Sequence, residues 1–68
     1  MLNDDPPPGT KVQFLRDIST RTRVAKAYDT GVLIAAKQKY AFDNPDDQFL
    51  VEYLGERFMV SRRDILNV

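Results

Sequence analysis

Apolar side chains alternate with polar ones in short runs along this 68-residue chain, and turn-forming residues separate the runs. In the run 48–54, Phe49, Val51 and Tyr53 fall on one side, and the run 10–16 alternates in the same way. Period two is the pattern of a strand that buries one face. A chain of this length has room for one domain only. The pattern therefore predicts one small all-β domain.

Three further segments are expected to add strands. The apolar run 31–36 predicts a central strand that continues toward Tyr40. Gly55-Glu56 predicts a two-residue hairpin turn of type II′, because glycine comes first. Residues 57–60 then form the returning strand of that hairpin.

Two segments need a closer interpretation. Residues 61–64 have the spacing of a helix capping box, with aspartate in place of glutamate, but too little chain follows for a helix. They predict a single 3₁₀ turn before a last short strand. Residues 18–27 leave two interpretations open: β-branched residues favour an extended arm, whereas Ser19 or Thr20 could cap a short helix.

Several strings carry a resemblance to a known family. They are Gly9-Thr10-Lys11-Val12, Gly31-Val32-Leu33, Phe49-Leu50-Val51-Glu52-Tyr53, Gly55 and Ser61-Arg62-Arg63-Asp64-Ile65-Leu66. With these strings the chain resembles the SH3-like small β-barrels, and its Gly-Thr-Lys-Val and Gly-x-Val are similar to strings of the SH3-like accessory subunits of photosynthetic complexes. The resemblance implies a five-stranded SH3-like barrel over residues 10–68. It implies no functional residue, because the Tyr-Trp-Tyr cluster of those subunits is missing after Arg16. Residues 1–9, with three consecutive prolines, predict a flexible proline-rich arm before the barrel.

Composition narrows the chemistry that the chain can perform. It holds neither cysteine nor histidine, which excludes disulfides, thiolate metal sites and the commonest general base. Asp46 and Asp47 follow Pro45, and no third ligand accompanies them, so they predict a solvated turn rather than a metal or acid–base site. The chain is expected to be no enzyme and to need no cofactor or metal. No apolar run reaches the length of a membrane span, and the acidic N-terminus lacks the features of a signal peptide, so a soluble, cytoplasmic protein is expected.

Charge is distributed unevenly although the formal net charge is zero. Residues 10–39 hold seven basic and two acidic side chains, and residues 40–56 hold five acidic and no basic ones. This asymmetry predicts a basic side and an acidic side, which would steer partners.

The candidate site is a surface of basic side chains and of the aromatic side chains expected outside the core. Its members are Arg21, Arg23, Lys26, Tyr28, Lys39, Tyr40 and Phe42. The leading hypothesis from sequence is a small protein-binding module, an accessory or regulatory subunit of a larger assembly. The alternative is a nucleic-acid-binding small barrel that uses the basic stretch 11–39, because basic residues interleaved with aromatics suit phosphates and bases. Zero net charge favours the protein partner.

Overall fold

The computed structural model describes residues 1–68, and every regular element is a strand or a 3₁₀ turn. In chain order the elements are β1 (Lys11–Phe14), β2 (Ile18–Ser19), β3 (Val24–Ala25), β4 (Thr30–Gln38), β5 (Gln48–Tyr53), β6 (Glu56–Ser61), the 3₁₀ turn η1 (Arg62–Asp64) and β7 (Ile65–Asn67). The prediction of an all-β domain with a 3₁₀ turn before the last strand is confirmed. No helix of the structure has the length and apolar character that crossing a membrane requires.

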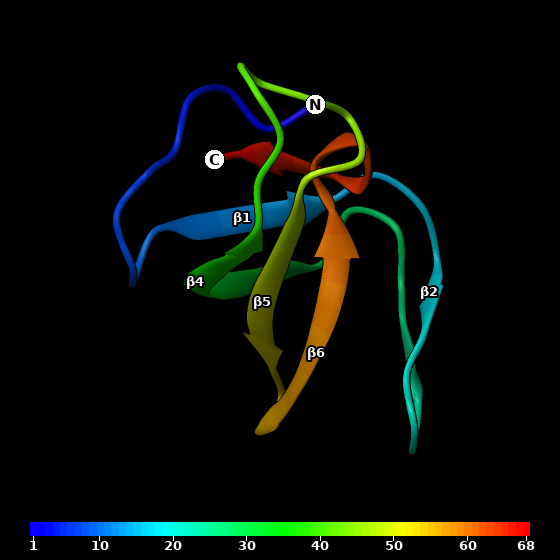
Figure 1. The fold of residues 1–68 in the computed structure, drawn as a ribbon. Helices are drawn as coiled ribbons and strands as arrows, with labels where there is room; N and C mark the ends of the chain where they lie inside the picture. Colours follow the sequence, from blue (N-terminus) through cyan, green and yellow to red (C-terminus); the bar gives the residue numbers. More distant parts are fainter.

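Five strands form one antiparallel sheet in the order β6-β5-β4-β1-β7. β4 is central, as its apolar run predicted, and β6 and β7 form the two edges. The strongly curved sheet wraps around the core, and β2 and β3 form a separate two-stranded hairpin beside it (Figure 1). This pairing makes an open sheet of five strands, with no ladder between β6 and β7.

The concave side of the sheet holds the core. Val12 and Phe14 on β1 and Phe49 and Val51 on β5 are almost completely buried, as the alternation predicted. The Phe14 ring packs edge-on against Tyr53, with ring centroids 5.5 Å apart. The buried apolar residues form one cluster, consisting of Leu2, Val12, Phe14, Ile18, Ala25, Leu33, Phe49, Val51, Val60 and Ile65.

Gly31 allows the central strand to approach this core. A Cβ at position 31 would lie 2.8 Å from the Glu52 carbonyl oxygen and 3.1 Å from the Phe14 ring. Both distances are shorter than ordinary contacts, so only glycine fits between β5 and the ring. The glycine that opens the apolar run is thus a packing requirement.

Residues 18–27 contain the two short strands of a hairpin, β2 and β3, which decides between the extended and the helical interpretation of the sequence. Ile18 pairs with Ala25 and Ser19 with Val24 in the β2–β3 hairpin. At its tip, the Thr20 N–H donates to the Arg23 carbonyl at 2.8 Å. The helical interpretation is wrong, because the buried Ile18 and Ala25 face the core across a hairpin rather than along one helix face.

The proline-rich segment 1–9 lies against the domain. Three prolines predicted an arm held away from it, since proline cannot donate to a sheet ladder. Leu2, however, is fully buried in the core, and its N–H donates to the Arg62 carbonyl at 3.1 Å. The N–H of Gly9 donates to the Leu33 carbonyl at 2.7 Å. One apolar side chain near the terminus thus anchors the segment, while the prolines stay outside the ladders.

Arg62 is buried in η1 and holds the N-terminal segment in place. Its Nε donates to Asp47 at 2.9 Å and its terminal nitrogens donate to the carbonyls of Leu2 and Asp4 and to the carboxylate of Asp5. The guanidinium also lies 4.9 Å from the centroid of the Phe49 ring. These contacts satisfy the charge and most of its donors inside the fold.

Asp47 is the buried partner of Arg62, which corrects the prediction of a solvated turn. Its side chain is inaccessible and accepts hydrogen bonds from the N–H groups of Tyr40 and Asn44 and from Lys39 Nζ. Burial alone would raise the pKa of Asp47, but these donors and Arg62 outweigh burial and lower it well below the ordinary range. Asp46, its neighbour, stays on the surface as predicted.

Residues 61–64 have the spacing of a capping box but do not form one in the structure. Ser61 makes no capping hydrogen bond through its side chain, and instead its hydroxyl accepts from Gln48 at 2.8 Å. Asp64 receives two hydrogen bonds from the Arg16 guanidinium, at 2.9 and 3.0 Å. The turn is therefore fixed by tertiary contacts rather than by its own cap.

Candidate functional site

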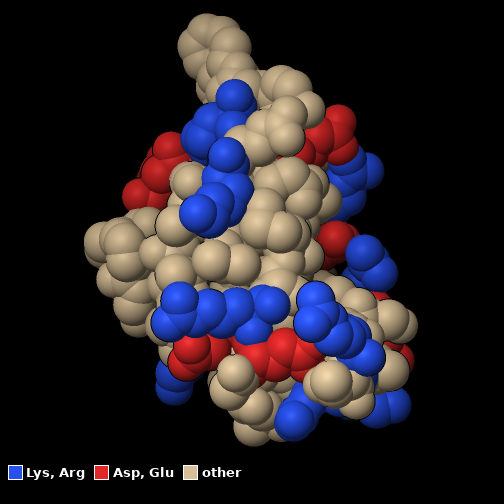
Figure 2. Space-filling model, turned by 60° about the horizontal axis from the view of Figure 1, so that its bottom comes forward, with Lys and Arg blue, Asp and Glu red and all other residues tan.

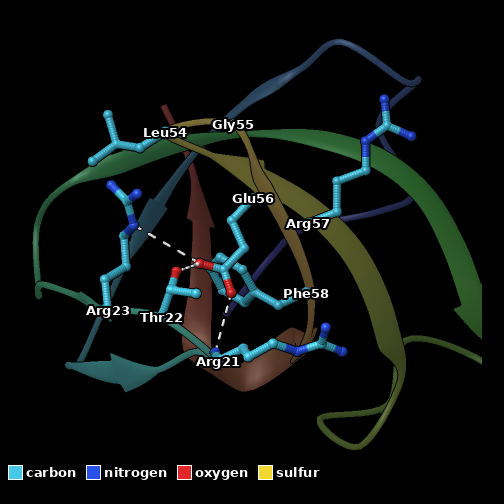
Figure 3. A pocket seen from close by; sticks show the side chains of 8 residues that line it. All are labelled: Arg21, Thr22, Arg23, Leu54, Gly55, Glu56, Arg57 and Phe58. Carbon is cyan, nitrogen blue, oxygen red and sulfur yellow. Dashed lines mark hydrogen bonds and ion pairs between the residues drawn. The ribbon is translucent and has the colours of Figure 1, made fainter.

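An open cleft of about 560 Å³ separates the tip of the β2–β3 hairpin from the turn between β5 and β6. Figure 3 shows the side chains around it, and the Glu56 carboxylate lies at its centre. The lining residues are Arg21, Thr22, Arg23, Leu54, Gly55, Glu56, Arg57 and Phe58. Three of these eight residues are arginines, and two of them, Arg21 and Arg23, belong to the surface predicted from the sequence.

The β5–β6 turn forms one wall of the cleft. Tyr53 pairs with Glu56, so the two turn residues are Leu54 and Gly55. Their φ angles are +50° and +82°, and positive values at both positions define a type I′ turn. The prediction of a type II′ turn at Gly55-Glu56 is wrong by one residue, because Gly55 is the second turn residue and Glu56 is already in β6.

Glu56 ties the two hairpins together. Its carboxylate accepts hydrogen bonds from the hydroxyls of Thr22 at 2.7 Å and Thr20 at 2.9 Å, and from the Arg21 N–H at 3.1 Å. Arg23 Nε lies 3.8 Å from the same group. The hydrogen bond from Thr22, with smaller contributions from Thr20 and the Arg21 N–H, lowers the pKa of Glu56 despite partial burial. These donors hold the ionised Glu56 carboxylate against the β2–β3 hairpin, and its only contact with a guanidinium is the long one to Arg23.

We expect the Glu56→Gln variant to melt at a lower temperature than the wild type at pH 7, because the amide accepts fewer of these hydrogen bonds. The folded pKa of Glu56 is lowered from its ordinary value of 4.5. Its stabilising contribution is therefore complete above that value and is lost as the pH falls through the lowered one. Melting curves between pH 7 and pH 3 should show the gap between the two proteins closing in acid. A gap of constant size across that range would contradict this role of Glu56.

The three arginines of the cleft are paired to different degrees. Arg21 contributes its backbone N–H to the Glu56 network, and its guanidinium makes no ion pair. Arg23 has only the 3.8 Å contact with Glu56. Arg57 Nε donates to Glu52 at 3.0 Å, in a pair that is about half exposed. Arg21 and Arg23 thus keep most of their donors for another molecule.

Basic and acidic side chains alternate over this end of the molecule rather than separating into two faces. Figure 2, which looks toward the cleft end, shows lysine and arginine atoms directly beside aspartate and glutamate atoms. Ion pairs join the basic stretch to the acidic one, as between Arg23 and Glu56 and between Lys39 and Asp47. The predicted division into a basic and an acidic side is therefore replaced by local clusters.

The seven residues predicted from sequence do not meet on one surface. Arg21 and Arg23 line the cleft, whereas the loop that carries the predicted Lys39, Tyr40 and Phe42 lies at the other end of β5 (Figure 1). A six-residue strand spans about 20 Å, which separates the two groups. Lys26 and Tyr28 lie between β3 and β4, outside the cleft.

The loop residues also differ in what they have left to offer a partner. Lys39 forms ion pairs with Asp5 at 2.8 Å and with Asp47 at 3.1 Å. The Tyr40 hydroxyl accepts a hydrogen bond from Gln38 at 3.0 Å. Phe42 is 93% exposed and, like Tyr28, has a positive φ. Neither the Phe42 ring nor the Tyr28 ring lines the cleft.

Leu54, Arg57 and Phe58 line the cleft and were missed from the sequence. Phe58 packs against the core cluster and also borders the cleft. One local signal was available: leucine precedes glycine in a two-residue turn, where asparagine or aspartate is usual. The approach of the β2–β3 tip to this turn is a tertiary contact without a local signature.

The described chain holds no group of three or more carboxylates placed to bind a metal ion. Comparison of the chain with protein-family models, with curated proteins and with solved structures finds no match in any of the three.

Proposed function

We propose that this chain is a non-catalytic binding module. Its partner is a protein, and the cleft between the β2–β3 hairpin and the β5–β6 turn captures an acidic segment of that partner. The observation that carries the proposal is the set of three arginines around one cleft whose only carboxylate, Glu56, is already occupied by the hairpin.

The chemistry of the cleft suits carboxylates. A guanidinium offers planar donors that match a carboxylate in a two-point contact. Arg21 has no acidic partner in the chain and Arg23 has only a long one. The hairpin tip that carries both is fixed by Thr20 and Glu56, so little backbone order has to be gained on binding.

A protein partner is supported over the nucleic-acid alternative. Glu56 lies in the cleft and Glu52 pairs with Arg57 beside it, so the basic side chains are interrupted by acidic ones and do not form the continuous positive track that a phosphate chain requires. Nucleic-acid grooves combine positive charge with aromatic faces for stacking, and Phe58, the one aromatic side chain in this cleft, is packed against the core. Of the basic stretch 11–39, Lys39 is engaged in ion pairs at the other end of β5.

The SH3-like barrel and the role of accessory or regulatory subunit are part of the same proposal. The strand order, the long excursion with a hairpin between β1 and β4, and the 3₁₀ turn before β7 support the barrel. A small binding domain that docks on a larger assembly agrees with the accessory role. The cytoplasmic location stays a prediction.

Charge reversal at Arg21 tests the proposal. We expect the Arg21→Glu variant to bind a fluorescent glutamate-rich peptide about three- to tenfold more weakly than the wild type in anisotropy titrations. An exposed ion pair contributes up to about 1 kcal/mol and reversal adds repulsion of similar size. Melting should be nearly unchanged, because the Arg21 guanidinium has no partner in the fold.

Lys37→Glu is the matched control. Lys37 is exposed near the end of β4 that lies away from the β5–β6 turn. The Lys37→Glu variant changes the net charge by the same amount as Arg21→Glu. Equal loss of binding in both variants would show general charge attraction rather than a site and would contradict the proposal. Tighter binding of an oligonucleotide of equal charge than of the peptide, with a steep dependence on salt, would favour the nucleic-acid alternative.

A further inference from the structure

Leu54 stands at a position that does not suit leucine. It is the first residue of the type I′ turn, with φ +50°, and a side chain with a Cβ is disfavoured there relative to glycine, asparagine or aspartate. Its side chain does not join the core cluster, and the residue is 66% exposed. Neither the backbone nor the side chain of Leu54 is therefore stabilised by what surrounds it in the free chain.

Leu54 borders the arginine cleft directly. Leu54 and Phe58 are the apolar residues of its lining. In Figure 3 the Leu54 side chain projects toward the same side of the opening as Arg23, while Arg57 lies toward the opposite side. The cleft thus presents an apolar contact next to guanidinium groups.

We infer that Leu54 is an apolar anchor for the partner, and that the segment bound in the cleft carries an apolar side chain beside its acidic residues. This inference rests on the proposed function and adds the class of segment to it. Backbone strain at an exposed position persists when the rest of the structure enforces it, and such positions occur often at binding sites. Burial of Leu54 against an apolar side chain would supply the stabilisation that the free chain lacks.

Phe42 is the other exposed apolar residue that most resembles Leu54. It is 93% exposed with φ +61°. It lies in the loop before β5, away from the cleft, and its neighbours in sequence include Asp43. Charge complementarity to an acidic segment is therefore found at Leu54 and not at Phe42.

The Leu54→Asn variant separates a binding role from a structural one. Asn-Gly is the preferred pair for a type I′ turn, so we expect this variant to melt at a higher temperature than the wild type. Two labelled peptides of equal charge serve as probes: one of glutamate, glycine and serine, and one in which a central serine is replaced by leucine. The wild type should bind the leucine-containing peptide about tenfold more tightly, as partial burial of two apolar side chains allows. Leu54→Asn should abolish that preference, so that this variant binds the two peptides with equal affinity.

Phe42→Asn is the control, since it makes the same type of change at another exposed position with a positive φ. It should keep the preference for the leucine-containing peptide. The inference is overturned if the wild type shows no preference, if Leu54→Asn retains it, or if Leu54→Asn melts at a lower temperature. Failure of both peptides to bind the wild type would instead overturn the proposed function itself, so the two failures are distinguishable.

Discussion

Replacement of Arg62 by methionine is expected to lower the free energy of unfolding by about 3 to 5 kcal/mol, the usual effect of removing one partner from a buried ion pair. The change removes the donors to Asp47, to the carbonyls of Leu2 and Asp4 and to Asp5. Asp47 then remains inside the fold with Lys39 as its only basic partner, and the N-terminal segment loses its bonds to the guanidinium. Urea unfolding followed by circular dichroism measures the effect.

Arg63→Met provides a control at the neighbouring position. Arg63 is exposed and pairs with the exposed Asp46 on the surface, and surface pairs contribute about 1 kcal/mol or less. A loss of stability in Arg62→Met no larger than in Arg63→Met would contradict the structural role of Arg62.

The second large loss of stability is expected at Phe14 of β1, whose ring is fully buried against Gly31 and Tyr53. Phe14→Ala removes this ring and leaves a cavity, and such changes cost about 3 to 5 kcal/mol. A domain of this size has a total stability of about 3 to 10 kcal/mol by the usual contribution per residue. Phe14→Ala is therefore expected to be largely unfolded at 37 °C in melting experiments.

Phe42→Ala makes the same substitution at a phenylalanine that is 93% exposed. It should melt within about 4 °C of the wild type, because surface substitutions usually change stability by about 0.5 kcal/mol or less. Similar melting of the two variants would show that Phe14 is not a core residue.

The strands and their buried faces could be predicted because their signals are local. Alternation places Val12 and Phe14, and likewise Phe49 and Val51, on one face whatever the rest of the chain does. The same local reasoning misplaced the β5–β6 turn by one residue. A glycine-first turn was the simpler match, and Leu54 is not a residue that turn preferences favour.

The buried charges could not be predicted in this way. Arg62 is bonded to Asp47, 15 residues earlier, and to Asp5, 57 residues earlier. Whether a charged residue is buried depends on whether such distant partners are present to compensate its desolvation. Neither period two nor composition contains that information, and the same reason explains why Leu2 was assigned to an arm.

The candidate site was predictable in part. Clustered positive charge identified Arg21 and Arg23, because it is visible in sequence. The same criterion added Lys39, whose charge is engaged by Asp5 and Asp47. Leu54 and Arg57 belong to a different hairpin, and only the approach of that hairpin to the β2–β3 tip makes them part of one cleft.

The cleft as the binding site is tested most directly by nuclear magnetic resonance. A ¹⁵N-labelled chain is titrated with the leucine-containing acidic peptide at low salt, and the amide shifts are followed residue by residue. We predict that the largest changes fall on residues 20–23 and 54–58, on both sides of the cleft. Changes that are absent, or that are largest in the loop of residues 39–47, would contradict the assignment of the binding site to the cleft.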